Sequence, residues 1–148
     1  MKTKHIPEGF QAVVPIMLAD DAAKLIDFIV KVFDGRELSR HAGPDGKIMH
    51  AEVKVGDCVI MLGNSNEKFP ANQTVLNIYT EDTDKIYKRA LEAGATSVAE
   101  PTNHFYGDRS GGVKDEFGNT WWIATHIEDV SPEEMKKRTE EFMMQQNN

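Results

Sequence analysis

The sequence predicts an α+β fold made of two pseudo-symmetric βαβββ modules followed by a C-terminal helix. Strand and helix patterns occur twice in the order β-α-β-β-β, parts of the first copy recur in the second at a near-constant spacing, and a helix start signal follows the second copy. A lone four-stranded sheet with one helix leaves its other face uncovered, so both modules are expected within one domain over residues 1–148. The expected boundaries are about 11–64, 74–126 and, for the C-terminal helix, 132–144.

The first module opens with an apolar, β-branched run over residues 11–18, which predicts a buried strand. Asp20 or Asp21 can cap a helix over residues 22–33, and Gly35 lies where a helix stop is expected. Further strands are expected over residues 37–41, 48–55 and 58–63, with turns at the GPDG of residues 43–46 and at Gly56-Asp57.

The second module repeats this pattern. Residues 74–79 predict a strand, and Asp82 predicts the cap of a helix that runs to about Ala93, with Gly94 as its stop. Strands are then expected over residues 97–99, about 110–114 and 120–125.

The repeat is visible in the spacing of matching residues. Asp21-x-x-Lys24-Leu25 matches Asp82-x-x-Lys85-Ile86 at an offset of 61, and Gly56-Asp57 matches Gly118-Asn119 at an offset of 62. A near-constant offset across a strand, a helix and a hairpin indicates an ancestral duplication.

The C-terminal helix has a clear start signal. Ser131 at the N-cap, Pro132 at the first helical position and Glu134 three residues after the cap form a capping box. The helix is expected to reach about Met144. Two interpretations of it remain open: a tail packed on the rest of the domain, or a contact with a second subunit.

Composition excludes several classes of partner. The net charge of −7, with no Lys/Arg cluster, disfavours nucleic acid and anionic membrane surfaces. The apolar run of residues 12–19 is interrupted by Pro15, which favours a strand over a signal peptide, and no apolar run approaches the ~20 residues that span a bilayer. Cys58 is the single cysteine, so no intrachain disulfide can form, and its run CVIML predicts a buried apolar role. We expect a cytoplasmic protein.

Three separated segments resemble one known superfamily. They are YGDRSGGVKDEFGNTWWIATH at 106–126, HAEVKVGDCVIML at 50–62 and EDTDKIYKRALEAGA at 81–95. Together they resemble the PhnB-like branch of the vicinal oxygen chelate superfamily, which includes glyoxalase I, extradiol dioxygenases and the fosfomycin and bleomycin resistance proteins. The resemblance covers about residues 10–130 and implies a homodimer. Glu116 replaces the proline of the branch's usual Asp-Pro-Phe-Gly turn, with little functional effect expected.

The resemblance also implies where a metal would be bound. In metal-dependent members the first and last strands of each module each offer one His, Gln or Glu side chain. The matching positions here are about Val14, Ile60, Val75 and Trp122. A shift of one residue gives Pro15, Met61, Leu76 and Trp121, or Val13, Val59, Thr74 and Ile123. None of these sets provides the donors that divalent ions need, so neither a metal nor another cofactor is expected.

Strand alternation instead predicts a small-molecule surface around Trp122. If Trp122 faces the cavity, then Thr120, Ala124 and His126 face it too, while Trp121 and Ile123 pack under the helices. By the same alternation Val75, Asn77 and Tyr79 share a face. An aromatic wall with a few polar groups suits an organic ligand, and we expect Trp122, His126 and Asn77 to bind it.

The polar residues around Arg109 allow more than one role. Tyr106 and Arg109, with His104 and Asp108, are expected in a Gly-rich loop, where binding residues are common. Tyr106 is a further candidate ligand-binding residue, and Arg109 either fixes an anionic ligand group or pairs with Asp108 or another carboxylate.

His50 and Glu52 are weak candidates for a catalytic acid and base. The competing interpretation is a polar strand face that meets solvent. A strict two-residue turn at Gly56-Asp57 pairs Glu52 with Met61 and puts it opposite to Ile60, whereas a turn one residue longer reverses this; the sequence does not decide between them.

Three functions follow from these observations. The first is metal-independent binding of a small organic molecule by a homodimer in an apolar, Trp-lined cavity. The alternative is a metal-dependent lyase, isomerase or dioxygenase of the same superfamily that uses non-standard ligands such as His50, Glu52 and His126. The third is an interaction module in which the C-terminal helix makes the contact.

Overall fold

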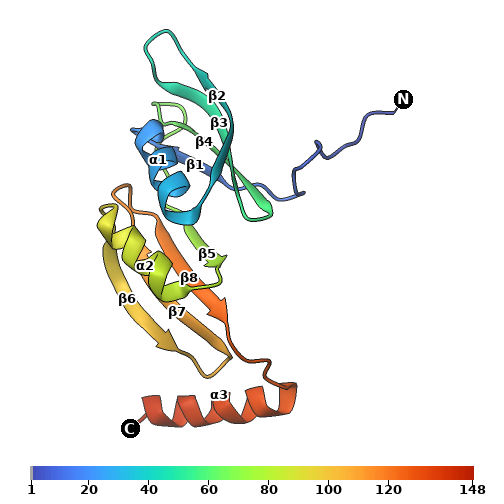
Figure 1. The fold of residues 1–148 in the computed structure, drawn as a ribbon, viewed down its shortest axis with the longest axis vertical. Coiled ribbons are helices and arrows are strands. Elements are labelled where there is room, and N and C mark those ends of the chain that lie inside the picture. The colour runs from blue at the N-terminus through green and yellow to red at the C-terminus, as the bar shows by residue number, and fades with distance from the viewer. Residues whose placement is uncertain (1) are drawn as a thin grey trace. The chain divides into compact units, whose positions relative to one another are not determined.

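The computed structural model describes residues 2–148 and divides the chain into two compact units, with the boundary between Thr74 and Val75. Each unit contains a four-stranded mixed sheet with a helix packed against it, and the second unit also carries the C-terminal helix (Figure 1). The predicted α+β architecture, with two βαβββ repeats and a C-terminal helix, is confirmed.

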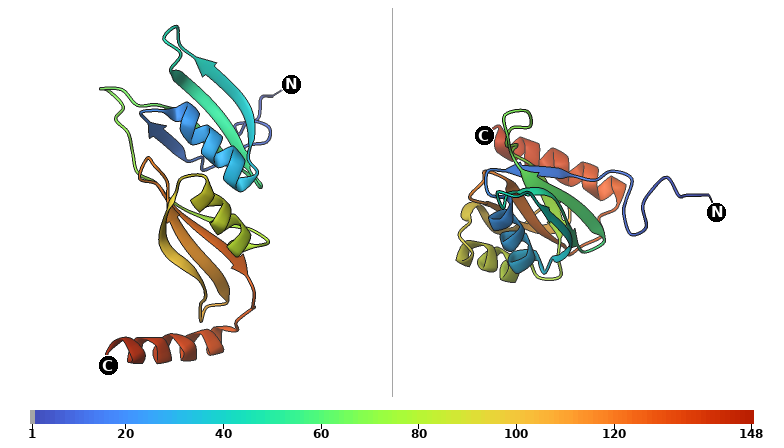
Figure 2. Two further views of the ribbon diagram at one scale, coloured as in Figure 1. Left: turned by 60° about the vertical axis from the view of Figure 1, so that its left-hand side comes forward. Right: turned by 90° about the horizontal axis from the view of Figure 1, so that it is seen from above.

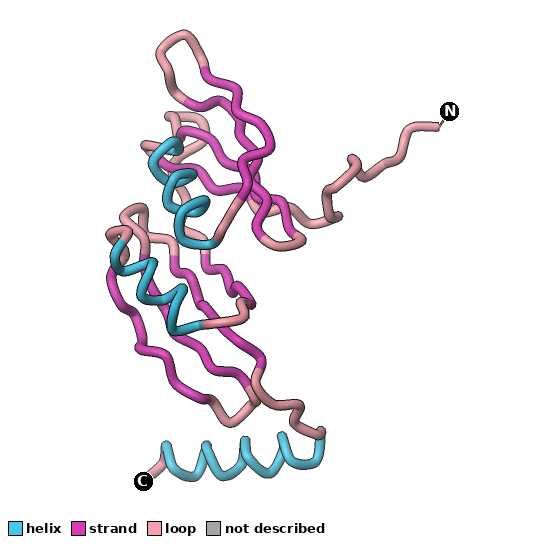
Figure 3. Tube along the Cα trace, in the orientation of Figure 1, coloured by secondary structure: helices cyan, strands magenta, loops and turns pink. Residues whose placement is uncertain are grey.

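The first unit has its strands in the order β1-β4-β3-β2. The first pair is parallel and the others are antiparallel, as a βαβββ module requires. The helix contacts all four strands (Figure 3). The elements are β1 (Ile16–Ala19), α1 (Ala22–Phe33), β2 (Arg36–Ala42), β3 (Ile48–Val55) and β4 (Cys58–Asn64).

Helix α1 begins and ends at the predicted residues, but a different residue stops it. The Asp21 side chain accepts a hydrogen bond of 3.1 Å from the Lys24 N–H, which caps the first turn. The left-handed residue that ends the helix is Asp34, with φ of 52°, and not the expected Gly35. Gly35 instead allows a close approach, since a Cβ there would lie 3.2 Å from Cγ1 of Val53.

Strand β1 begins at Ile16, five residues later than the sequence predicts. Pro15 has no N–H to offer a neighbouring strand, and only its carbonyl pairs, with the Met61 N–H at 2.9 Å. Gln11 is nevertheless held beside β4, because its carboxamide donates to the Val59 carbonyl at 2.8 Å and accepts from the Val59 N–H at 3.1 Å. A side chain thus replaces the expected backbone ladder.

The Gly56-Asp57 turn is the strict two-residue turn, because Val55 pairs directly with Cys58. Cys58 is therefore the first residue after the turn and is exposed, so the predicted buried role was wrong. Local desolvation and the hydrogen bond to Asp57 raise the pKa of the Cys58 thiol, which disfavours the reactive thiolate.

The second unit repeats the arrangement of a helix packed against a sheet (Figure 2), and its strands are in the order β5-β8-β7-β6 (Figure 1). Asp82 caps the helix through the Lys85 N–H at 3.1 Å, and Gly94, with φ of 103°, follows the helix end as predicted. The elements are β5 (Val75–Tyr79), α2 (Thr83–Glu92), β6 (Thr96–Asn103), β7 (Asp108–Lys114) and β8 (Thr120–His126).

Strands β6 and β7 are longer than predicted, because the segment between them is a tight turn. The His104 N–H donates to the Asp108 carbonyl at 2.8 Å, and the Gly107 N–H donates to the His104 carbonyl at 3.1 Å. Gly107 has φ of 99°, which a residue with a side chain rarely adopts. Asp108 and Arg109 consequently lie in a strand and not in a loop.

The two adjacent tryptophans follow the turn between β7 and β8 and lie on opposite faces of the sheet. That turn spans Asp115 to Asn119 and is longer than the equivalent turn of the first unit. Trp121 is fully buried, and its indole N–H donates to the Asp115 carboxylate at 2.8 Å. Trp122, the next residue along the strand, faces the other way, so one tryptophan fills the core and its neighbour occupies the opposite face.

The C-terminal helix α3 (Pro132–Gln146) contacts the turn between β6 and β7. Ser131 accepts from the Glu134 N–H at 3.2 Å, which confirms the predicted N-cap. Arg138 donates to Glu128 at 2.7 and 2.9 Å and to the Phe105 carbonyl at 3.0 Å, and the ring centroids of Phe105 and Phe142 lie 4.9 Å apart. Of the helices in residues 2–148, none is long and apolar enough to cross a membrane.

Candidate functional site

The two faces of the second sheet differ in what covers them. Helix α2 packs over one face, where Val113, Trp121 and Ile123 are fully buried. We call the opposite face the open face; the register places on it Val75, Asn77 and Tyr79 of β5, Asp108, Ser110 and Gly112 of β7, and Thr120, Trp122, Ala124 and His126 of β8. The alternation predicted for β5 and β8 is confirmed.

The Trp122 ring lies directly over Gly112 of the neighbouring strand on the open face. Trp122 pairs with Gly112 of β7, and a Cβ built on Gly112 would lie 2.5 Å from Cζ3 and 2.7 Å from Cε3 of the indole ring. Carbon atoms in contact are ordinarily about 3.5–4.0 Å apart, so only glycine leaves room for the ring. The half-buried indole thus forms an aromatic wall fixed by the backbone beneath it.

A hydrogen-bonded cluster lies at the end of the open face that contains His126. The Asp108 carboxylate, whose side chain is 11% exposed, accepts from the Tyr79 hydroxyl at 2.8 Å and bonds Nδ1 of His126 at 2.8 Å. Nε2 of His126 bonds the Asp129 carboxylate at 2.8 Å. We call Tyr79, Asp108, His126 and Asp129 the Asp108 cluster.

The hydrogen bonds of this cluster shift the pKa of two of its members, His126 and Tyr79. The hydrogen bonds to Asp108 and then to Asp129 raise the pKa of His126, because two carboxylates favour the imidazolium form. The hydrogen bond to Asp108 raises the pKa of the Tyr79 hydroxyl, and burial together with the Asp108 charge raises the pKa of Tyr106. At neutral pH both tyrosines therefore remain protonated, as hydrogen-bond donors.

We expect the pKa of His126, measured by NMR titration of its ring protons, to lie above the reference value of about 6.5. Asp108→Asn should lower it more than Asp129→Asn, since Asp108 provides the larger interaction. Because the pKa of His126 is higher in the folded than in the unfolded protein, its protonation stabilises the fold fully at pH values below the unfolded-state pKa. This stabilisation is lost as the pH rises through the folded-state pKa. A wild-type pKa at or below 6.5, with the resonance assigned through His126→Gln, would contradict this arrangement.

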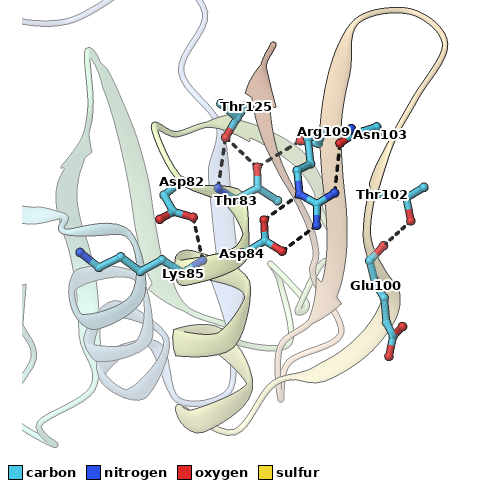
Figure 4. A network of polar contacts seen from close by, with 9 residues as sticks. All are labelled: Asp82, Thr83, Asp84, Lys85, Glu100, Thr102, Asn103, Arg109 and Thr125. Atoms are coloured by element: carbon cyan, nitrogen blue, oxygen red, sulfur yellow. Dashed lines mark hydrogen bonds and ion pairs between the residues drawn. The ribbon is translucent and has the colours of Figure 1, made fainter.

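Arg109 lies on the face that α2 covers and not on the open face. Its Nε and Nη2 atoms donate to the two Asp84 carboxylate oxygens at 2.7 and 2.8 Å, and Nη1 donates to Asn103 at 3.0 Å (Figure 4). The ion pair lowers the pKa of Asp84. Of the two predicted roles, the structure shows the ion pair, with Asp84 of α2 as the partner, and the guanidinium is not presented beside Trp122.

Tyr106 and Asn77 have different surroundings. Tyr106 lies in the turn between β6 and β7, where its ring stacks on His104 with centroids 5.1 Å apart and meets Phe105 edge-on at 5.5 Å. Asn77 lies on the open face in β5, directly beside Trp122 in the register. Asn77 thus adjoins the aromatic wall, whereas Tyr106 lies near the Asp108 cluster.

His50 and Glu52 lie on the face of the first sheet that α1 does not cover. Glu52 pairs with Met61, as the strict two-residue turn requires, and so lies opposite to Ile60. Nε2 of His50 bonds Oε1 of Glu52 at 3.0 Å, and the Ser39 hydroxyl donates to Oε2 at 3.1 Å. These hydrogen bonds lower the pKa of Glu52, which therefore stays ionised.

The structure corrects one of the four positions at which the superfamily binds its metal. Ile16 pairs with Met61 and Asn77 pairs with Trp122, so a constant offset of 61 equates Met61, and not Ile60, with Trp122. Ile60 is buried under α1; the sequence assignment was wrong because the two hairpin turns differ in length. Val14 lies just before β1.

The corrected positions do not fit a divalent metal centre. They supply two valines, an indole and one thioether, which is a soft donor and not a ligand for hard cations. Within residues 2–148, no group of three or more His, Cys, Asp or Glu side chains is placed to hold a metal ion.

Of the Asp108 cluster, only His126 was predicted from the sequence as a binding residue; Tyr79, Asp108 and Asp129 were not. Tyr79 was placed on the correct face by alternation, but its partner Asp108 was assigned to a loop, so the two were never brought together. Asp129 lies outside both modules, in the segment between β8 and α3. The available signal was the length of β7, since a strand that begins at Asp108 pairs that residue directly with His126.

Comparisons with known proteins agree with this fold. Residues 11–123 match the model of the Glyoxalase/Bleomycin resistance protein/Dioxygenase superfamily. The uncharacterized protein Mb0911c of Mycobacterium bovis is 34% identical over 136 residues, which cover 84% of this chain and 90% of that protein.

Solved structures show the same architecture. TioX from Micromonospora sp. ML1 is 24% identical with a TM-score of 0.68, covering 79% of this chain and 99% of that one. The Bacillus cereus structure described as a putative 3-demethylubiquinone-9 3-methyltransferase, PhnB protein, is 17% identical with a TM-score of 0.60, covering 78% and 99%. The chain belongs to the glyoxalase/bleomycin resistance protein/dioxygenase superfamily.

Proposed function

We propose that this protein binds a small organic molecule against the open face of its second sheet, without the metal centre of its superfamily. The observation that carries the proposal is the close contact of the Trp122 ring with Gly112 beneath it. Stacking on an indole favours aromatic or apolar ligands, and Asn77 beside it offers a polar group for orientation. Sequestering or carrying such a ligand requires no catalytic group.

We also propose that the chain belongs to the PhnB-like branch and forms a homodimer in the cytoplasm. The segment around the double tryptophan and the similarity to the Bacillus cereus structure support the branch. Exposed apolar side chains on α3, at Phe142, Met143 and Met144, offer a surface for a second copy.

An enzyme that holds a metal through His50, Glu52 and His126 is the weaker candidate. Both ring nitrogens of His126 already bond carboxylates, and both oxygens of Glu52 already have hydrogen-bond partners. Metal binding would have to displace these contacts. The binding function requires no such rearrangement.

Thermal unfolding in the presence of a diverse metabolite panel tests the binding function. A ligand at 100 times its Kd should add about 2.7 kcal/mol, which raises the Tm by several degrees. Trp122→Ala should abolish the shift for every hit, while Phe69→Ala, an exposed aromatic residue of the first unit, should leave it unchanged. Hits whose Tm shift survives in Trp122→Ala would argue against a site at this face.

A further inference from the structure

We propose that Asp129 occupies the place of a ligand carboxylate, so that the open face takes a monocarboxylic acid whose aromatic or alkyl body lies against Trp122. This inference rests on the proposed function and narrows it to a ligand class. The acid would bind Nε2 of His126, the atom that Asp129 now contacts at 2.8 Å.

His126 is held ready for such an anion. Its Nδ1 is fixed by the Asp108 carboxylate, which is itself fixed by the Tyr79 hydroxyl. The remaining ring nitrogen is therefore held in a set direction, and it carries a proton when the ring is cationic. Orientation through the second nitrogen is how proteins commonly present a histidine to a partner.

Asp129 is an exchangeable partner for this nitrogen. Its side chain is 101% exposed, and in the part of the chain that the structure describes, His126 is the single partner of its carboxylate. Exposed ion pairs contribute little stability, because water solvates both groups nearly as well. A ligand carboxylate can therefore replace that of Asp129 at small cost and without a change in the charges around His126.

The backbone that carries Asp129 does not need to move for this exchange. The Ile127 and Glu128 N–H groups donate to the Gly107 carbonyl at 2.9 and 3.1 Å, and Glu128 is paired with Arg138 of α3. A Cβ on Gly107 would clash with the Glu128 carbonyl, so the two segments are in close contact. A side-chain rotation of Asp129 alone exposes Nε2.

The spacing along β8 sets the shape of the ligand. His126 lies four residues beyond Trp122 on the same face, a distance of about 13 Å along a strand. Tyr79, 64% exposed, lies beside Ala124 between them. A linear acid with an apolar body of this length can therefore contact both rings and reach His126.

The charge on His126 makes this recognition depend on pH. The imidazole bonds the carboxylates of Asp108 from β7 and of Asp129 from the segment after β8. Tyr79 of β5 bonds the same Asp108 carboxylate, whose charge also acts on Tyr106. The hydrogen bonds to Asp108 and Asp129 raise the pKa of His126, and below that pKa the ring is cationic. Preference for an acid should disappear as pH rises through that pKa.

The test compares 6-phenylhexanoate with the neutral 6-phenylhexan-1-ol, with Kd measured by calorimetry and by tryptophan fluorescence at pH 6. The wild type should bind the acid about tenfold more tightly. Asp129→Asn should raise the affinity for the acid several-fold and leave the alcohol unchanged. Glu133→Gln removes an equally charged, exposed carboxylate four residues further along the chain. It should change the affinity for neither the acid nor the alcohol.

In His126→Gln the acid and the alcohol should bind with about equal affinity, because the cationic partner of the carboxylate is gone. Addition of the acid to the wild type should also shift the NMR resonances of the His126 ring, a readout independent of any variant's folding. Alcohol binding with no preference for the acid would overturn the inference and leave the proposed function intact. If neither the acid nor the alcohol bound and the tryptophan fluorescence did not change, the result would count against both this inference and the proposed function.

Discussion

Asp115→Ala is expected to lower the free energy of unfolding by about 4 kcal/mol or more, the largest loss among the substitutions considered. The Asp115 carboxylate is 5% exposed and accepts hydrogen bonds from the backbone N–H groups of Phe117 and Asn119. It also accepts from the Asn119 carboxamide and from the Trp121 indole at 2.8 Å. Each donor left unpaired in a buried position costs roughly 1–3 kcal/mol.

Urea denaturation measures this loss through the midpoint of the transition. Asp45→Ala is a matched control, because Asp45 accepts a backbone hydrogen bond of 3.0 Å from Lys47 in the exposed turn of the first unit. It should cost about 1 kcal/mol or less, since water can replace the lost acceptor. Equal losses for the two variants would show that Asp115 is not the organising residue of its turn.

The elements predicted correctly from sequence are those whose cause is local. Helix α1 was predicted at its observed bounds, because its Asp21 cap and apolar spacing lie within one short segment. Strand β3 and the Gly56-Asp57 turn were identified by alternation and by turn residues. The start of β1 was missed because Pro15 limits the backbone pairing and Gln11 instead bonds Val59, 48 positions away, through its side chain.

The candidate site was predictable only in part, for the same reason. Alternation placed Trp122, Asn77 and His126 on one face, since the period of a strand is a local property. Ile60 was assigned to the wrong face because the number of residues in each hairpin turn fixes the register, and the two turns differ. The Asp108 cluster joins residues from β5, β7, β8 and the following segment, so no single segment of sequence indicates it.

Gly112→Ala is expected to displace the Trp122 ring and to weaken ligand binding at least tenfold. The new Cβ would lie 2.5 Å from the ring, about 1 Å inside an ordinary carbon–carbon contact, so the indole must rotate away from the strand. Overpacking of this kind typically costs about 1–3 kcal/mol of stability. The displaced ring should show red-shifted fluorescence, because it meets more water, whereas Trp121 stays buried.

Gly111→Ala separates the loss of the aromatic wall from a general loss of stability. Gly111 is the preceding residue of β7 and faces the α2 side, where a Cβ would lie 3.0 Å from Cγ of Pro101. Both alanine variants should therefore lose stability, but only Gly112→Ala should shift the tryptophan emission and lose affinity for ligands. If both variants bound ligand as the wild type does, the position of Trp122 over Gly112 would have no part in recognition, and the aromatic wall could not be the ligand site.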